Sequence, residues 1–250
     1  MSPFSFCPVY FQNDLYKCLT EGLSLGKEVS LIACVLLAIA IPYLLGSLNF
    51  GIILSRIFFH EDIRDYGSGN AGSTNMLRTY GKKAAALTLV CDMLKAALAV
   101  LVGALFLNPA TRVTPVDGIA IASLFVVLGH CFPCFYRFRG GKGVATLGMV
   151  ILITRPLIFV LVFFVFVVLV AGTRFISLGS IISALLFPVL LNRLDTAYPM
   201  GWFQLMAVLM AFLVLFMHRA NIKRLLEGKE SKLSFGKKKK TEPEKNSDHK

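Results

Sequence analysis

Long apolar stretches alternate with short polar segments along most of this chain. A helix needs about 20 predominantly apolar residues to cross the hydrocarbon core of a bilayer. Windows of roughly this kind run over Leu31–Phe58, Ala84–Leu107, Val116–Phe135, Pro156–Gly172 and Gly201–Met217. Two further windows are marginal, because Val144–Ile153 is short and Ile176–Leu191 is interrupted by serines and Pro188. The pattern predicts an all-α polytopic membrane protein with about seven transmembrane helices, or five if the marginal windows are re-entrant or interfacial.

Basic residues fall mainly on one side of the seven predicted spans. The segments 55–83 and 136–142, Arg174 and the C-terminal tail together hold 20 of the 26 lysine and arginine residues. Lysine and arginine accumulate on the cytoplasmic side of membrane proteins. The sequence therefore predicts an N-terminus outside and a C-terminus in the cytoplasm, with the glycine-rich polar segments on the cytoplasmic face.

The composition excludes a soluble domain, since 56% of the residues are hydrophobic, 16% are charged and the mean hydropathy is +0.71. The net charge of +12 is explained by membrane orientation and by contact with anionic membrane lipid, so nucleic acid is not expected as a partner. Six cysteines are scattered without a framework that would indicate disulfides.

Three regions differ in character. Residues 1–30 mix acidic and basic positions, unlike a signal peptide, and are interpreted as an N-terminal extension. Residues 31–225 hold the apolar windows and form the integral membrane domain. Residues 226–250 are rich in lysine and are expected to be a disordered cytoplasmic tail.

The polar segment from Asp62 to Gly81 has the chemistry of an anion cradle. Its glycines permit close backbone approach, and it offers side-chain donors from Ser68, Asn70 and Thr74, with Arg78 nearby. Residues 67–72 also match a dinucleotide fingerprint, but that motif needs a preceding strand and here a membrane helix precedes it. A glycine-rich turn without a ligand is the competing interpretation for this segment alone.

A second polar segment places Lys142 between glycines just before a predicted helix, where its ammonium and free N–H groups could converge on one phosphate. It is not a Walker A loop, because the upstream glycine and the Ser or Thr after the lysine are missing. Cys131 and Cys134, with His130 beside them, could form a redox or metal pair. No second ligand pair occurs in the sequence, so no metal is predicted.

Three other pairs of residues carry possible chemistry. His60 and Asp65 have a spacing that glycerolipid acyltransferases use to activate a hydroxyl, although such a pair arises often by chance. Asp92 and Lys95 lie three apart inside a span and are expected to neutralise each other, as a structural pair or as part of a site. His218 and Asn221 also lie three apart, on one face at the end of the last span.

Taken together, these segments resemble the bacterial acyl-phosphate–glycerol-3-phosphate acyltransferases, the PlsY family. The resemblance covers nearly all of the chain between Leu31 and Lys229. It is carried by Tyr43–Gly51, Gly67–Arg78, Asp92–Lys95, Gly129–Pro133, Gly140–Thr146, Ser177–Ile181 and His218–Leu226. The sequence departs from the family pattern at Asn49 in place of Pro, Ser73 in place of Ala, Ala96 in place of Gly and Arg139 in place of Lys.

The resemblance implies transfer of a fatty acyl group from acyl phosphate to the first hydroxyl of glycerol 3-phosphate, which gives lysophosphatidic acid and phosphate. It implies a seven-helix enzyme of the bacterial inner membrane with its active site at the cytoplasmic face and no cofactor. The family's functional positions match Ser68, Arg78, Lys142, Ser180, His218 and Asn221, and Asn70 and Thr74 belong to the same first loop. The oligomeric state is left open, and a monomer is compatible with the sequence.

The residues fit this chemistry without appeal to the family. Acyl phosphate is already activated, so the hydroxyl can attack it directly and no enzyme nucleophile is required. The difficulty is to hold two phosphate dianions together, and Lys142, Arg78 and Arg139, with N–H groups such as those of Gly140 and Gly141, are expected to supply the compensating field. Ser68 and Asn221 are expected to orient the reacting groups. The proton could leave through His218 or through a substrate phosphate.

Two functions of other classes remain open from the residues alone. A transporter of phosphorylated metabolites would use the same anion cradle, although no inverted repeat is visible. A structural or scaffold protein would not depend on Lys142.

Overall fold

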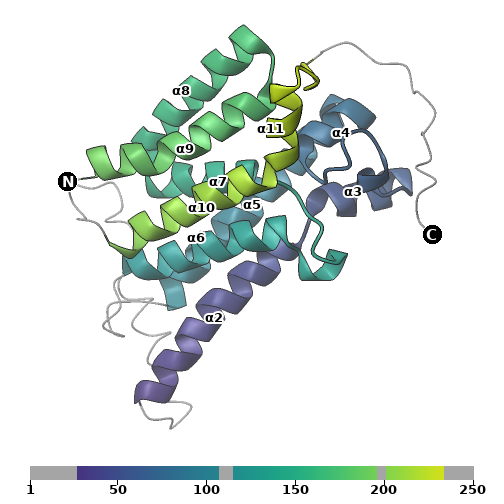
Figure 1. The fold of residues 1–250 in the computed structure, drawn as a ribbon. Coiled ribbons are helices and arrows are strands. Elements are labelled where there is room, and N and C mark those ends of the chain that lie inside the picture. Colours follow the sequence, from purple (N-terminus) through teal and green to yellow (C-terminus); the bar gives the residue numbers. More distant parts are fainter. Residues whose placement is uncertain (1–26, 107–114, 196–200, 234–250) are drawn as a thin grey trace.

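The computed structural model describes residues 27–106, 115–195 and 201–233, and the regular elements within these ranges are all helices (Figure 1). In chain order they are α2 (Lys27–Ser47), α3 (Phe50–Phe59), the 3-10 turn η1 (Ile63–Asp65), α4 (Ser73–Tyr80), α5 (Lys82–Phe106), α6 (Pro115–Cys131), the 3-10 turn η3 (Cys134–Tyr136), α7 (Val144–Thr154), α8 (Pro156–Thr173), α9 (Ile176–Leu194), α10 (Trp202–Met217) and α11 (Arg219–Leu226). The expected extension 1–30 lies almost wholly outside the described residues.

Five stretches of helix in the described residues are long and apolar enough to cross a bilayer, and a sixth is reached if α10 and α11, which meet at a bend of 56°, count as one span. The prediction of an all-α integral membrane protein is confirmed at this level. The marginal window Ile176–Leu191 becomes a full helix of 19 residues, α9. By contrast, α10 has only 16 residues, and α7 has 11. Of the predicted spans, α7 is therefore the one whose length least supports a membrane crossing.

The first predicted span is not one continuous helix. Leu31–Phe58 was expected to run through, whereas α2 ends at Ser47 and α3 begins at Phe50. Asn49 is the N-cap residue of α3 and has an extended backbone, but its side chain makes no capping hydrogen bond. The whole stretch is longer than the about 20 residues that a bilayer requires, so the break costs no hydrophobic thickness, and α3 contacts α4 and α5.

Helix α6 lies at the centre of the bundle and contacts α2, α5, α7 and α10. Its crossing with α2 depends on glycines, because a Cβ atom added at Gly46 would collide with the Val126 carbonyl and one at Gly129 would collide with the Tyr43 carbonyl. Small residues allow membrane helices to approach this closely.

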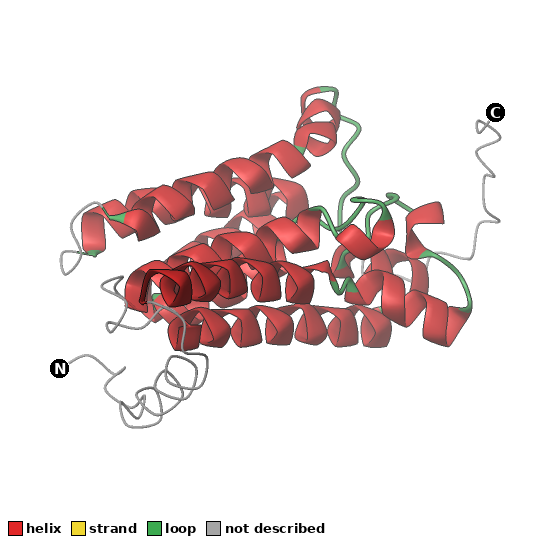
Figure 2. Ribbon diagram, turned by 90° about the horizontal axis from the view of Figure 1, so that it is seen from below, coloured by secondary structure: helices red, strands yellow, loops and turns green. Residues whose placement is uncertain are grey.

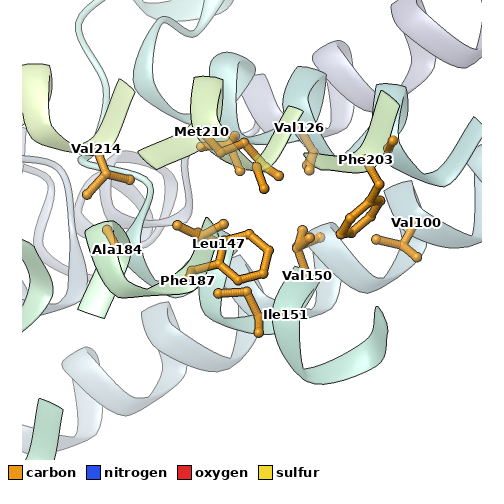
Figure 3. Packing of buried hydrophobic residues seen from close by; sticks show 14 of the residues in the cluster. Val100, Val126, Leu147, Val150, Ile151, Ala184, Phe187, Phe203, Met210 and Val214 are labelled. Atoms are coloured by element: carbon orange, nitrogen blue, oxygen red, sulfur yellow. The ribbon is translucent and has the colours of Figure 1, made fainter. Parts of the chain in front are cut away.

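The main hydrophobic cluster lies where α6, α7, α9 and α10 meet. In Figure 3 the side chains of Val126, Leu147, Phe187 and Met210 converge on the space between these helices. Helix α8 is different, since only 11% of its apolar window is buried inside the protein. Its exposed residues are apolar, as expected of a helix that faces lipid.

Within the part of the chain that the structure describes, most of the loops gather at one end of the bundle, as Figure 2 shows. Helices α3, α4 and α11 lie at that end in Figure 1. The polar segments between α3 and α4, before α7 and after α11 thus meet, although they are far apart in the sequence.

Candidate active site

A cavity of about 400 Å³ opens at this end of the bundle. Its wall is polar on one side, where the loops and the ends of α9 and α10 meet, and apolar on the other, between α5, α7, α8 and α9. Most of the site residues predicted from the sequence lie in this wall: Ser68, Asn70, Thr74, Arg78, Lys142, Ser180, His218 and Asn221. Residues of four separate segments are thus brought together as expected.

The first loop is held by Asn75, a buried residue that was not among the predicted site residues. Its Oδ1 accepts a hydrogen bond of 2.9 Å from the Ser68 N–H. Its Nδ2 donates to the carbonyls of Ile63 at 3.1 Å and Tyr66 at 2.9 Å. Both sides of one amide are therefore used to fix the turn, and the turn directs Ser68 and the first residues of α4 toward the cavity. An Asn in a glycine-rich turn is the only sequence signal for this role.

Lys142 lies in the connection between η3 and α7, two residues before the helix begins. Its Nζ donates a hydrogen bond of 2.6 Å to Asn221 Oδ1. Burial lowers the pKa of Lys142 to about 8, an effect that Glu230 opposes and that Arg224 and Arg78 reinforce. A cation that is partly desolvated and crowded by other cations is stabilised by an arriving anion, so phosphate would restore its charge.

A carboxylate that sequence analysis did not select completes the polar wall. Glu230 Oε1 accepts hydrogen bonds from Asn221 Nδ2 at 2.7 Å and from Ser177 Oγ at 2.8 Å, and Oε2 pairs with Arg224 Nε at 2.7 Å. Burial alone would raise the pKa of Glu230, but these hydrogen bonds with Asn221, Arg224 and Ser177 hold it below its usual value. Glu230 therefore sets the orientation of Asn221, which in turn holds Lys142.

The sequence predicts a disordered tail that begins at residue 226, but the structure places the first residues of this segment against the bundle. Residues 227–233 follow α11 back to the bundle, and the Leu233 N–H donates to the Arg174 carbonyl at 2.7 Å. The resemblance to the family ends at Lys229, one residue before Glu230. The rest of the tail, residues 234–250, lies outside the described residues.

His218, which directly follows α10, and Ser180 of α9 line the cavity. His218 Nδ1 lies 2.7 Å from the Val214 carbonyl oxygen. A carbonyl can only accept, so Nδ1 carries the proton. Burial and the nearby Lys142 lower the pKa of His218 to about 4, so the ring is neutral and keeps a lone pair on Nε2. Ser180 Oγ donates to the Ile176 carbonyl at 2.9 Å, within its own helix. His218 can therefore accept a proton or a hydrogen bond, whereas Ser180 has oxygen lone pairs available to the cavity.

Three predicted phosphate ligands do not lie in the cavity wall: Arg139, Gly140 and Gly141. The Gly140 N–H donates to the Cys131 carbonyl at 3.2 Å, and the Gly141 N–H donates to the His130 carbonyl at 3.0 Å. Arg139 is exposed, and its carbonyl accepts from Arg64 at 3.2 Å. Direct contact of these groups with phosphate does not fit this geometry, because the protein itself uses both N–H groups.

The structure also locates the other residue pairs that the sequence analysis singled out. His60 and Asp65 are both exposed and lie outside the cavity wall, so the hydroxyl-activating arrangement does not form there. Cys131 is fully buried. Within the described residues no group of three or more His, Cys, Asp or Glu side chains is placed to hold a metal ion. Asp92 lies in the cavity wall and is paired with the buried Lys95 at 2.8 Å.

Comparison with known proteins decides the family. A family model described as glycerol-3-phosphate acyltransferase matches residues 36–228. The chain belongs to this family. Among its relatives, the glycerol-3-phosphate acyltransferase of Bartonella henselae is 42% identical over 194 residues, which are 77% of this chain and 89% of the relative. That of Thermoanaerobacter pseudethanolicus is 42% identical over 193 residues, which are 77% and 92% of the two chains.

Two solved structures are similar as well. Both are crystal structures of PlsY, an integral membrane glycerol 3-phosphate acyltransferase. Its glycerol 3-phosphate form is 33% identical, with a TM-score of 0.70 over 80% of this chain and 96% of the other. Its lysophosphatidic acid form is 32% identical, with a TM-score of 0.66 over 82% and 96%. The chain is thus a PlsY-type glycerol-3-phosphate acyltransferase that produces lysophosphatidic acid, and the transporter and scaffold interpretations are set aside.

Proposed function

We propose that the cavity is the active site, that the acyl donor is acyl phosphate and that the acceptor is the sn-1 hydroxyl of glycerol 3-phosphate. The observation that carries the proposal is a cavity with two cations, Lys142 and Arg78, at its polar side and an apolar wall opposite them. Acyl phosphate has the same division between a phosphate and an apolar chain. The PlsY structures are described as forms with glycerol 3-phosphate and with lysophosphatidic acid, the acceptor and the product of this reaction.

Charge compensation is the main task of the polar wall. Two phosphate groups must lie close enough for one substrate to attack the other, and their repulsion is strong where water is excluded. Lys142 and Arg78 supply positive charge, while Ser68, Asn70 and Thr74 offer hydrogen bonds to phosphate oxygens. Cations and dipoles fixed before the substrates arrive lower the barrier without reorganisation during the reaction.

The transfer needs no covalent intermediate on the enzyme. The sn-1 oxygen forms a bond with the acyl carbonyl carbon, the bond from that carbon to the phosphate oxygen breaks, and inorganic phosphate leaves. The hydroxyl proton passes to an acceptor, for which His218 Nε2 and an oxygen of the departing phosphate are the two candidates. Asn221 is held by Glu230 and Lys142 at hydrogen-bonding distance and is placed to orient the reacting groups.

The fatty acyl chain would occupy the apolar wall. Leu147 and Ile151 of α7 face Phe159, Val162 and Phe163 of α8 across this part of the cavity. Because α8 is mostly exposed to lipid, a chain between α7 and α8 has a direct route to the membrane interior. We therefore expect both the acyl donor and the product to be in contact with membrane lipid.

A seven-helix arrangement with the cavity at the cytoplasmic face of the bacterial inner membrane is part of the proposal. The seven helices would be α2, α5, α6, α7, α8, α9 and α10, with the N-terminus outside. The distribution of basic residues supports this orientation, since the loops of the cavity end carry most of them. Labelling of single cysteines at positions 68 and 142, in a background without other cysteines, tests it. Reaction with a membrane-impermeant reagent from the periplasmic side of intact cells would contradict it.

The acyl donor is tested with purified enzyme in liposomes. Labelled glycerol 3-phosphate is incubated with acyl phosphate, acyl-CoA or acyl carrier protein carrying the same chain, without added metal. Lysophosphatidic acid is expected from acyl phosphate alone. The variant His60→Ala is a control that should retain activity, because His60 is exposed and outside the cavity. Equal product from acyl-CoA would refute the proposed donor.

A further inference from the structure

Three ionisable side chains form a buried hub, and two of them, Asp92 and His130, also lie in the wall of the active-site cavity. Asp92 and Lys95 of α5 and His130 of α6 are 1%, 3% and 3% exposed. Lys95 Nζ is 2.8 Å from Asp92 Oδ1 and 3.0 Å from His130 Nδ1. Ionisable groups at membrane depth are costly and are usually kept for function. The chemistry described above gives this hub no task.

The ammonium of Lys95 closes the C-terminal end of α2. Its Nζ donates to the carbonyls of Gly46 at 2.9 Å and Leu48 at 2.6 Å. The last carbonyls of a helix lack partners within the helix, and a cation is favourable at that end. Lys95 therefore stabilises the break between α2 and α3, where the main chain turns toward the first polar loop.

The three protons of Lys95 are fully used. Asp92 Oδ1 has no partner with hydrogen-bond geometry, so its contact with Lys95 is an ion pair. The donors then go to the two carbonyls and to His130 Nδ1. Since His130 Nδ1 accepts, the ring proton lies on Nε2 and the ring cannot turn over without losing the Lys95 contact. His130 is thereby fixed in one orientation.

The fixed ring of His130 supports the loop that carries Lys142. Gly141 lies directly against it, so that a Cβ atom added at Gly141 would collide with His130 Nε2. The Gly141 N–H also donates to the carbonyl of His130 at 3.0 Å. The next residue is Lys142, whose Nζ reaches Asn221 at 2.6 Å. The position of the ring therefore determines where the Lys142 main chain lies.

The hub reaches the first loop as well. The ring of Phe50, the first residue of α3, has its centre 5.8 Å from Lys95 Nζ. Gly51 follows, and a Cβ atom there would collide with the carbonyl of Ala71 in the loop that carries Ser68 and Thr74. The same ammonium thus contacts elements that lead to both polar segments of the active site.

We propose that Asp92, Lys95 and His130 are positioning residues that hold the two polar loops of the active site in register, with the His130 ring as the support for Gly141 and Lys142. The proposal rests on the proposed function, because it assigns these residues to the placement of the phosphate-binding groups. It differs from a purely structural ion pair, which could be replaced by apolar residues without changing the kinetics of the folded enzyme.

Steric rescue provides the decisive test. We expect Gly141→Ala to lower kcat/KM for glycerol 3-phosphate by about 100-fold, since a displacement of about 1 Å can have an effect of this size. His130→Ala should lower it by about 10-fold, because the loop loses its support. In the double variant the added methyl group occupies the space of the missing ring, so kcat/KM should be no lower than in His130→Ala alone.

Kinetics are measured on folded enzyme in nanodiscs, with the melting temperature of each variant recorded. Lys95→Met should reproduce the His130→Ala defect, and Cys91→Ala, which changes the residue next to Asp92 on α5, should behave as wild type. Losses that multiply in the double variant, or wild-type kcat/KM in His130→Ala, would overturn the proposal. A wild-type enzyme that is inactive with acyl phosphate would instead refute the proposed donor. The double variant would then be compared with Gly141→Ala using the acyl donor that supports activity.

Discussion

The two glycine-rich segments of this enzyme look alike in sequence but differ in the structure. Residues 67–75 line the active-site cavity along most of their length. In residues 139–143 only Lys142 and Gly143 reach it. The first segment turns at Gly67 and Gly69, whose φ angles are +61° and +68°. The second is pressed against the end of α6, where Gly140 and Gly141 leave room for the main chain and ring of His130.

The difference shows what a glycine in a sequence does and does not reveal. It shows that a side chain is absent, but it does not show what occupies the space. In the first segment that freedom allows a turn that presents polar side chains to a ligand. In the second it allows the protein to pack against itself, and a single lysine carries the contact with the cavity.

The largest effect is expected for Lys142→Ala. This change removes the one cation that the second segment contributes to the cavity, so kcat/KM should fall by about 10³-fold, as when a preorganised charge or donor is lost. Arg139→Ala is the matched control in the same segment, because Arg139 is exposed and outside the cavity wall. It should change kcat/KM by less than about threefold in the same acyl-transfer assay. A similar loss in both variants would mean that the whole segment contacts substrate.

In the first segment, Asn75→Ala should have the next largest effect. The change removes three hydrogen bonds and leaves the Ser68 N–H and the Ile63 and Tyr66 groups without their partners. A cost of about 2–4 kcal/mol is expected in the stability of the loop. The KM for glycerol 3-phosphate should rise by more than about tenfold, with a smaller change in kcat.

Ser73→Ala is the control for this prediction. It removes a polar group from the same segment and leaves the hydrogen bonds made by Asn75 in place. Its KM should stay near that of wild type. An unchanged KM in Asn75→Ala would show that the first loop keeps its shape without the amide.

The pH dependence tests the charge of the second segment directly. The pKa of Lys142 is lowered to about 8, so the free enzyme loses this cation as the pH rises through that value. We therefore expect kcat/KM, which reports the free enzyme, to fall above about pH 8. Glu230 raises the pKa of Lys142, so Glu230→Gln should move this limb of the profile to lower pH.

Glu227→Gln is the control for the pH experiment. Glu227 lies near Glu230 in the sequence but pairs with Lys229 at 3.2 Å and is not in the cavity wall. Its profile should match that of wild type. A limb that stays in place in Glu230→Gln would indicate that a group other than Lys142 is responsible for it.

Sequence alone predicted the polar groups that line the cavity with their own side chains. Lys142, Asn221, His218 and Ser68 stood out because a cation, amide, imidazole or hydroxyl next to a membrane helix is unusual. The all-helical membrane fold followed from the apolar windows. These features depend on local composition, which a sequence displays directly.

The remaining features depend on contacts between distant residues. Glu230 was missed because it lies in a lysine-rich stretch, and its partner Ser177 is 53 residues away. The break at Asn49 was missed because Asn does not interrupt a helix as Pro does, and the carbonyls freed there are held by Lys95 of another helix. The role of Gly141 could not be predicted either, because only the fold brings His130 against it.

Among the substitutions expected to impair the enzyme, Gly69→Ala should have the smallest effect. It tests most directly how the two glycine-rich segments differ. Gly69 has a φ angle of +68°, which disfavours a side chain by about 1 kcal/mol. However, a Cβ atom there would lie 3.5 Å from its nearest neighbour, the Arg64 carbonyl oxygen, and would not collide with it. We expect a rise of only about two- to fivefold in the KM for glycerol 3-phosphate, because strain without a collision shifts the loop little. Gly141→Ala should be far more damaging although its φ angle is not positive, since there the methyl group meets a fixed ring. If both substitutions had equal effects in the same assay, backbone conformation would govern both segments and the distinction between a turning loop and a packed one would fail.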